Sequence, residues 1–221
     1  MPVRRVKGKL LKYGVMSRDS RLNRHLPQTR QLRESELRSM LKRYSTLFIK
    51  PDKGSGGHGI IRVRRLSESK MKVEWGRNRS VVHPKALTPM LCEITNPSHR
   101  YLIQQGVSLS RVNGRAFDIR VFMQKPKNRW VVSGKVVRVA SRGRFLTNYH
   151  QGAKPAPVPQ VLHQLYRGEK AAKMMQKIDS LSCFITGVGC SLSRDTGIGG
   201  RYCSRPEGEV MDFGSEHQSR L

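Results

Sequence analysis

The sequence lacks an apolar run long enough to cross a membrane and has few aromatic residues. No stretch of 18 apolar residues occurs, so no membrane-spanning helix is predicted. Aromatic residues make up 6% of the chain, without RNP-like or zinc-finger spacing, so the specific nucleic-acid modules are not indicated. The N-terminus has no apolar segment of signal-peptide length. Four cysteines without close pairing are typical of a reduced, cytoplasmic protein.

Acidic residues are also scarce. The chain has 43 Lys and Arg against 15 Asp and Glu, a formal net charge of +28. Such an excess favours an anionic partner, because each neutralised phosphate releases counterions. Nucleic-acid binding is one interpretation; a basic surface that also suits phosphorylated ligands is the one we favour. No histidine or cysteine group has metal-ligand spacing, so the sequence predicts no metal site of its own.

The hydrophobic pattern predicts a mixed α and β chain of 221 residues, long enough for one sizeable domain or two small subdomains. Residues 1–30 are expected to form a loosely structured lead-in, and 153–159, with three prolines, a loop. Helices are predicted over 32–44, 86–94 and 161–186. Strands are predicted over 47–49, 60–63, 71–75, 101–107, 117–124 and 130–140.

One segment places a lysine and four glycines between two apolar runs. Lys50 ends the run 47–49, and the next run, 60–63, follows the glycines. Glycines leave backbone N–H groups free to close on an anion, and Lys50 can place an ammonium beside the same anion. The segment therefore predicts a phosphate-binding β-hairpin, with the loop residues Gly54, Ser55, Gly56, Gly57, His58 and Gly59.

Three familiar glycine loops do not fit this segment. The dinucleotide-binding fingerprint has the same glycine spacing but must open a helix, whereas 60–63 has a strand pattern. A P-loop ends in Gly-Lys-Ser/Thr, whereas Lys50 precedes the glycines. A protein kinase is excluded because no His-Arg-Asp motif occurs and the Asp-Phe-Gly at 212–214 lies too near the end for an activation segment.

The order strand, Lys-Pro, glycine loop, strand resembles the ATP-grasp superfamily. Three later blocks continue the resemblance, and together they are similar to the YheC/YheD family of spore-coat-associated ATP-grasp proteins. These blocks are 101–107, 113–121 and 134–152, and the resemblance covers 46–187. It implies an α+β ATP-grasp fold, with the nucleotide between two α+β subdomains, the last of them incomplete.

The resemblance implies a nucleotide-binding role for several residues. Lys50 would bind the α- and β-phosphates, and the backbone of the glycine loop would close over the β- and γ-phosphates. In the strand 101–105, backbone groups would read the adenine edge. Leu102 and Ile103 would supply an apolar wall, and Gln104 or Gln105 would hold the ribose.

A second set of residues is implied in the transfer step. Arg120 would meet a phosphate or an acyl phosphate, since a guanidinium binds two oxygens at once. Arg138 and Asn148 would face the transferring group. Asp118 is a further cofactor-binding candidate and lies on the same strand face as Arg120. For both residues the alternative is structural, a pairing with neighbouring side chains.

The chain departs from the family after Thr186. ATP-grasp enzymes end in strands with acidic magnesium ligands, a Glu-x-Asn near a tryptophan, which the sequence lacks. Read one base later, the codons of Met211 and Asp212 force a tryptophan, and their neighbours permit DRKGKLWILEANTNPD. We therefore hypothesise a frame shift near Val188, in the gene or its sequencing, that replaces or truncates the magnesium-site strands.

These observations together predict four segments and a function. The segments are a basic N-terminal part (1–45), a glycine-loop subdomain (46–106), an incomplete second subdomain (107–187) and an aberrant, poorly ordered tail (188–221).

The expected function is ATP binding. The resemblance also implies carboxylate–amine ligation, which we expect to be impaired because the magnesium-ligand strands are missing. The expected cofactors are ATP and magnesium; the acceptor and oligomeric state cannot be predicted. Cytoplasmic location is expected, with spore association implied by the resemblance. The alternative is a non-enzymatic protein that binds nucleic acid or an anionic spore component.

Overall fold

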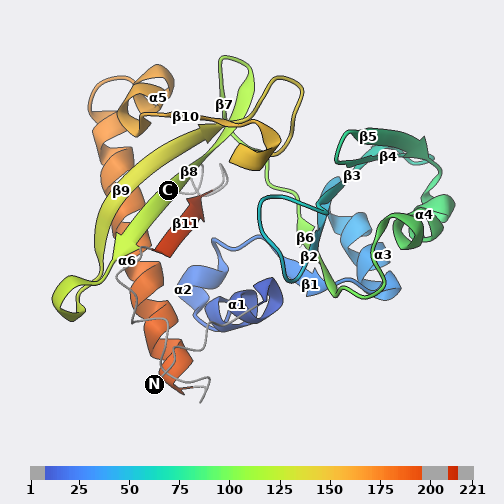
Figure 1. The fold of residues 1–221 in the computed structure, drawn as a ribbon, viewed down its shortest axis with the longest axis horizontal. Helices are drawn as coiled ribbons and strands as arrows, with labels where there is room; N and C mark the ends of the chain where they lie inside the picture. The colour runs from blue at the N-terminus through green and yellow to red at the C-terminus, as the bar shows by residue number, and fades with distance from the viewer. Residues whose placement is uncertain (1–7, 196–208, 214–221) are drawn as a thin grey trace. The chain divides into compact units, whose positions relative to one another are not determined.

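The computed structural model describes residues 8–195 and 209–213 (Figure 1). These residues form two compact units, which we describe separately. The glycine-loop unit contains the described residues up to 13 and residues 26–107. The large unit contains residues 14–25 and the described residues from 108 onward. Among the described helices, none has the length and hydropathy needed to span a membrane.

A six-stranded sheet forms the glycine-loop unit. All its neighbouring strands are antiparallel, in the order β1-β6-β2-β3-β4-β5. The strands are β1 (Thr29–Gln31), β2 (Thr46–Pro51), β3 (Ile61–Ser67), β4 (Lys70–Trp75), β5 (Asn78–Val82) and β6 (Tyr101–Gln105). Because β2 lies between β6 and β3, the strand that ends in Lys50 is central in the sheet.

One face of this sheet packs on helices α3 (Glu34–Arg43) and α4 (Leu87–Ile94), the latter preceded by a 3-10 turn, η1 (Pro84–Ala86). Helix α3 buries Leu37 and Met40, and its acidic first turn and basic last turn complement the helix dipole. Side chains alternate between the two faces of a strand, so Leu47 and Ile49 join this core. Phe48 and Lys50 lie on the second face, which we call the Lys50 face.

The large unit contains a five-stranded sheet, with the order β10-β9-β8-β11 and a short β7 paired to β8. Its strands are β7 (Arg111–Val112), β8 (Arg115–Gln124), β9 (Val131–Val139), β10 (Lys154–Ala156) and β11 (Glu209–Phe213). Two 3-10 turns, η2 (Pro126–Asn128) and η3 (Tyr149–Gln151), lie between strands. All its pairs are antiparallel.

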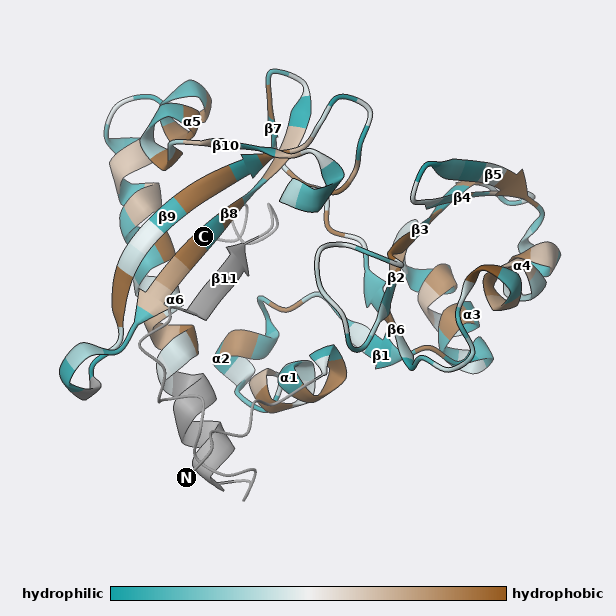
Figure 2. Cartoon of the chain, in the orientation of Figure 1, coloured by the Kyte–Doolittle hydropathy of each residue, from teal (hydrophilic) through white to brown (hydrophobic). Residues whose placement is uncertain are grey.

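Helices α5 (Val158–Leu165) and α6 (Glu169–Asp195) cover one face of this sheet, and Figure 1 shows α6 running along β8 and β9. Strand β8 buries alternate residues, Phe117, Ile119 and Val121, in the shared core. In Figure 2 hydrophobic segments of β8 and β9 are separated by paler and hydrophilic ones. The intervening β8 residues, Asp118 and Arg120, therefore point to the other face.

The structure differs from the predicted elements in three places. The helix predicted over 161–186 is two helices, broken where Gly168 adopts a φ of +55°. The predicted loop over 153–159 contains β10 and the first turn of α5, where a proline is tolerated because its missing N–H would have no helical partner. Strand β5 was also not predicted.

The expected loose lead-in is also wrong in its described part. Residues 8–31 contain α1 (Lys9–Met16), α2 (Ser20–Asn23) and β1. Asp19 caps α2 by accepting a hydrogen bond from the Arg21 N–H at 2.9 Å. Leu22 is buried in the core of the large unit, and Met16 packs against the same core.

Part of the predicted aberrant tail lies among the described residues. Helix α6 continues to Asp195, beyond its expected end, and β11 adds a strand beside β8. The sequence pattern does not predict β11, because Glu209–Phe213 has only one short apolar alternation among Gly, Ser and Arg residues. Residues 196–208 and 214–221 lie outside the described residues.

Candidate functional site

The glycine loop joins β2 to β3 in the predicted hairpin, whose strands pair antiparallel. Its four glycines all have positive φ: +117° at Gly54, +71° at Gly56, +80° at Gly57 and +68° at Gly59. L-residues avoid these conformations, so the glycines are required by the path of the backbone. Ser55 and His58 lie in the same loop and are exposed.

Gly59 has a second requirement, which gives a prediction about stability. A Cβ at Gly59 would lie 2.9 Å from Cγ of Pro51, whereas Gly76, with a φ of +53°, has open space. We expect Gly76→Ala to cost about 1–2 kcal/mol of unfolding free energy through backbone strain alone. Gly59→Ala should cost roughly 1 kcal/mol more, because Pro51 must move. Denaturant unfolding of both variants measures this difference, and equal losses would contradict it.

Lys50 is held by a chain of hydrogen bonds on the Lys50 face. Its ammonium donates to Gln104 Oε1 at 2.6 Å and lies 5.4 Å from the centre of the Phe48 ring. Gln104 Nε2 donates to the hydroxyl of Thr29 at 2.8 Å, and that hydroxyl donates to the Pro27 carbonyl at 2.9 Å. Since the Thr29 proton is used by Pro27, Gln104 must present its amide N–H₂ to Thr29 and its oxygen to Lys50.

The hinge-strand residues separate between the two faces of the sheet. Leu102 is opposite Lys50 in the ladder, so it lies on the Lys50 face, where an apolar wall was expected. Ile103, which was expected in the same wall, is fully buried in the core on the helix-covered face, so its side chain does not share a face with Lys50. Gln104 lies opposite Phe48, on the Lys50 face.

Gln105 points to the same face as Ile103. It is opposite Leu47 in the ladder, and its side-chain oxygen accepts from the Gln28 N–H at 3.1 Å. Of the two glutamines proposed for the ribose, Gln104 is therefore the one that shares a face with Lys50. The sequence could not separate the two, because the register of β6 decides which of them faces Lys50.

The Lys50 face also carries an ion pair between β3 and β4. Arg62 Nε donates to Glu74 Oε2 at 2.8 Å, and Lys72 lies 3.3 Å from Glu74 Oε1. Burial raises the pKa of the Glu74 carboxyl, but the hydrogen bonds and charges of Arg62 and Lys72 outweigh burial and lower it below its ordinary value of 4.5. Glu74 therefore stays ionised and neutralises part of the basic charge on this face.

The sequence reasoning missed Asp52, at the start of the glycine loop, and Lys9 of α1, which contacts it. Asp52 is 8% exposed, and its carboxylate accepts from the Leu10 N–H at 2.8 Å. The Lys9 ammonium donates to the carbonyls of Pro51 at 2.6 Å, Asp52 at 3.3 Å and Gly54 at 3.2 Å. These partners are more than forty residues apart in the sequence, so no local pattern indicates the contact.

In the large unit, a buried polar cluster brings together three of the predicted site residues. Asp118 and Arg138 are cross-strand neighbours, 6% and 2% exposed, and form a bidentate ion pair in which Arg138 Nε donates to Asp118 Oδ1 at 2.7 Å. Arg138 Nη1 also donates to Asn148 Oδ1 at 3.2 Å. Thr147, which the sequence reasoning did not select, donates its hydroxyl to Asp118 at 2.6 Å. We call these four residues the buried polar cluster.

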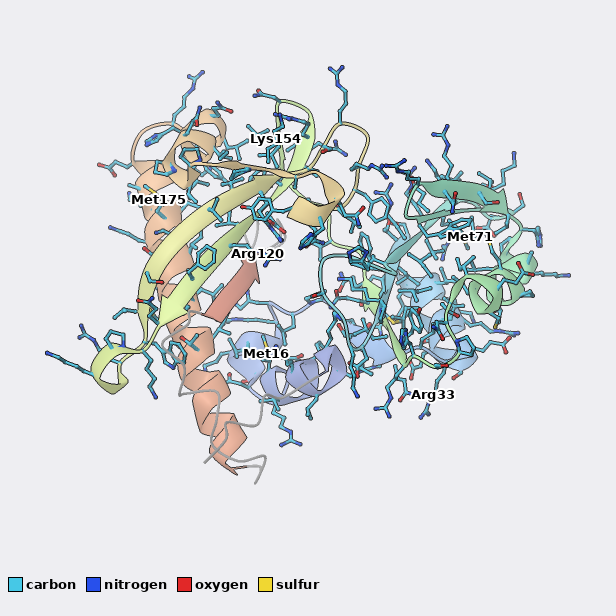
Figure 3. All side chains as sticks on the ribbon, viewed as in Figure 1. Met16, Arg33, Met71, Arg120, Lys154 and Met175 are labelled. Atoms are coloured by element: carbon cyan, nitrogen blue, oxygen red, sulfur yellow. The ribbon has the colours of Figure 1, made fainter. Side chains whose placement is uncertain are left out.

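Arg120 lies in the middle of β8, two residues beyond Asp118 on the same face (Figure 3). It is half-buried and is opposite Val136 on β9 and Asp212 on β11. The structure thus shows Asp118 paired with a neighbouring side chain, that of Arg138, which was one of the two interpretations of its sequence position.

The described residues contain no group of three or more His, Cys, Asp or Glu side chains suited to a metal ion. Asp118 is the buried carboxylate of β8, and both its oxygens are occupied, one by Arg138 Nε and the other by Arg138 Nη2 and Thr147. These residues do not fit a magnesium ion held by protein carboxylates.

Of the comparisons with known proteins, one shows the family of this chain. A search of curated proteins gave no match. Among solved structures, N5-carboxyaminoimidazole synthase from Aspergillus clavatus, in complex with ADP and 5-aminoimidazole ribonucleotide, aligns at 12% identity with a TM-score of 0.39. The alignment covers 64% of this chain and 30% of that chain. The family model described as YheC/D-like ATP-grasp matches residues 4–186. Because that match covers most of the chain, the protein belongs to the YheC/D-like ATP-grasp family and has a mixed α+β ATP-grasp fold.

Proposed function

We propose that the chain binds ATP on the Lys50 face of the glycine-loop unit. The observation that carries the proposal is the conjunction of Lys50 with the glycine loop. An ammonium, oriented by Gln104, lies at the end of β2 where the chain enters a loop with four positive-φ glycines. Such a loop can bring backbone N–H groups close to phosphate oxygens, and charge-assisted hydrogen bonds to an oxyanion are the strong ones.

Leu102 and Gln104 are our candidates for contact with the nucleoside. Leu102 is apolar and lies beside Lys50, which suits the face of an adenine ring, but it is 1% exposed, so a neighbouring side chain must move for the ring to reach it. The backbone of Tyr101–Gln105 would read the edge of the base, as the resemblance implies. Ile103 could contribute through its backbone alone, because its side chain belongs to the opposite face.

The hydrogen-bond chain behind Lys50 predicts a role for Thr29. Thr29→Val removes the hydroxyl that fixes the Gln104 amide, so the amide can turn its N–H₂ toward Lys50 and repel it. We expect ATP affinity to fall about fivefold, corresponding to the loss of roughly one hydrogen bond of 1 kcal/mol. Thr29→Ser keeps the hydroxyl and should bind ATP like the wild type in calorimetric titrations. Equal affinities for the Val and Ser variants would contradict this role.

For the transfer chemistry, we propose the carboxylate–amine ligation of the family at a strongly reduced rate. Arg120, half-buried on the same face of β8 as Asp118, is our candidate for contact with a phosphate or an acyl phosphate, since a guanidinium binds two oxygens at once. ATP-grasp chemistry uses magnesium to neutralise the phosphates, and the described residues do not fit its carboxylate ligands. The missing Glu-x-Asn is our reason for the reduced rate.

We attribute the missing residues to a frame shift near Val188. The nucleotide sequence tests this directly: reading one base later should encode Trp-x-x-Glu-x-Asn over residues 205–221. Any other reading there removes the frame-shift explanation and leaves the altered tail as a feature of this protein.

The proposed ATP binding is tested by nucleotide protection of the intact chain. We expect ATP to raise the melting temperature, and the rise to grow with the logarithm of ATP concentration above the Kd, because ATP binds the folded state alone. The net charge of +28 favours a second candidate, sequence-independent binding of nucleic acid. Duplex DNA binding that weakens steeply with salt, without protection by ATP, would support that candidate and contradict ours.

A further inference from the structure

We propose that Lys9 is a positioning residue that organises the glycine loop for phosphate from behind. The inference rests on the proposed ATP binding and concerns the same loop. The evidence for the role of Lys9 is separate from the evidence for Lys50, because it consists of the contacts between residues 8–10 and residues 51–54. All of these residues belong to the glycine-loop unit.

The Lys9 ammonium collects three carbonyl oxygens from the start of the loop, those of Pro51, Asp52 and Gly54. The backbone N–H of Lys9 donates to the same Asp52 carbonyl at 3.1 Å. An ammonium has three protons to donate, and three carbonyls are a full set of acceptors for it. Burial lowers the pKa of the Lys9 amine below its ordinary value of 10.5, while the charge of Asp52 opposes this shift.

These contacts fix the direction of the neighbouring amides. In a trans peptide the carbonyl of one residue and the N–H of the next point in opposite directions, and the described chain has no cis peptide. The first of the three peptides shows the effect: the Pro51 carbonyl accepts from Lys9, while the Asp52 N–H points away and donates to the Arg100 carbonyl at 2.8 Å.

The same rule applied to the other two carbonyls turns the N–H groups of Lys53 and Ser55 away from Lys9. Lys53, Gly54 and Ser55 are exposed, so these N–H groups face outward. Neither of the two amides donates a hydrogen bond to any residue that the structure describes. Two outward N–H groups, two residues apart and next to glycines, are suited to the oxygens of a polyphosphate.

A second contact keeps Lys9 in place. The Asp52 carboxylate accepts from the Leu10 N–H at 2.8 Å, and a Cβ at Gly8 would lie 3.0 Å from its Oδ2. Gly8, with a φ of +125°, therefore lets the chain pass close to Asp52. Asp52 and Lys9 thus hold each other's segments: the carboxylate fixes the start of α1, and the ammonium fixes the start of the glycine loop.

The test compares ATP with adenosine on the intact chain and on Lys9→Met, which keeps the length of the side chain but removes its charge. We expect Lys9→Met to weaken ATP binding about tenfold and to leave adenosine binding unchanged, because only the phosphates use the loop amides. Lys12→Met is the matched control. Lys12 lies one turn further along α1 and is exposed, and its side chain forms no hydrogen bond or ion pair with the described loop residues. Its loss therefore removes the same charge without removing a loop contact. Equal weakening by both variants would overturn the inference, since it would show a general charge effect.

A second measurement on the wild-type chain covers the case in which Lys9→Met does not fold. Binding of ATP or inorganic tripolyphosphate should shift the amide resonances of Lys53 and Ser55, and the absence of these shifts in the bound chain would overturn the inference. If the chain binds tripolyphosphate at these amides but does not bind ATP, the proposed nucleotide function is wrong, while the role of Lys9 in phosphate binding still holds. A chain that binds neither would overturn both.

Discussion

Replacing Arg138 by Met is expected to reduce the unfolding free energy by about 3–5 kcal/mol. The reason is the position of Asp118, which is 6% exposed and receives a bidentate contact from Arg138 and a hydroxyl from Thr147. Methionine fills a similar volume but carries no charge. The buried Asp118 carboxylate therefore loses its guanidinium partner and keeps the weaker hydrogen bond from the Thr147 hydroxyl. Chemical denaturation followed by circular dichroism measures the loss.

Two further variants show whether the loss comes from the buried charge. Lys135→Met breaks an ion pair between β9 and α6, with Asp179 at 2.7 Å, but these side chains are 20% and 40% exposed. That change should cost no more than about 1 kcal/mol, because water screens the pair. The double change Asp118→Leu and Arg138→Met removes both charges and should recover most of the stability. A double variant as unstable as Arg138→Met would show that the cluster contributes through its shape instead.

Replacing Lys50 by Met is expected to weaken ATP binding about ten- to hundredfold. A hydrogen bond to a charged group contributes roughly 1.5–3 kcal/mol, and each 1.4 kcal/mol is a factor of about ten in affinity. Lys42→Met is the control with the same change of charge, because Lys42 is exposed on α3, the helix that packs on the other face of the sheet. Its ATP affinity should remain within about twofold of the wild type, as expected for a distant, solvent-screened charge.

Calorimetric titration of the three proteins measures this difference. Lys50→Met leaves Gln104 Oε1 without its donor, so its melting temperature must be measured as well. If both lysine variants lose affinity equally, ATP is attracted by the net charge of the chain and the site is not on the Lys50 face.

The parts of the fold that were predicted from the sequence are those with a local signal. Leu37, Met40 and Leu41 at helical spacing predict α3, and β-branched runs on either side of four glycines predict the β2–β3 hairpin. The break at Gly168 was missed because apolar residues continue at helical spacing on both sides of it. The N-terminal helices were missed because they are short: α1 has eight residues with Gly14 among them, and α2 has four.

The candidate site was predicted only in part, for a similar reason. Residue types and order indicate Lys50, the glycine loop and strand 101–105, but not which side chains share a face. Leu102 and Ile103 look alike in the sequence, and the register of β6 on β2 places them on opposite faces. The partners Asp118 and Arg138 are 20 residues apart, and Lys9 and Pro51 are 42 apart, so neither contact has a local pattern.

The most direct test of the ATP site is to map the backbone amides that respond to ATP in the intact chain by NMR. We expect the largest shifts at Lys50, over 53–59 in the glycine loop and over 101–104 in β6. Residues of α3 and α4, on the opposite face, should change little. Shifts scattered over basic surface residues, without a cluster on the Lys50 face, would contradict the proposed site.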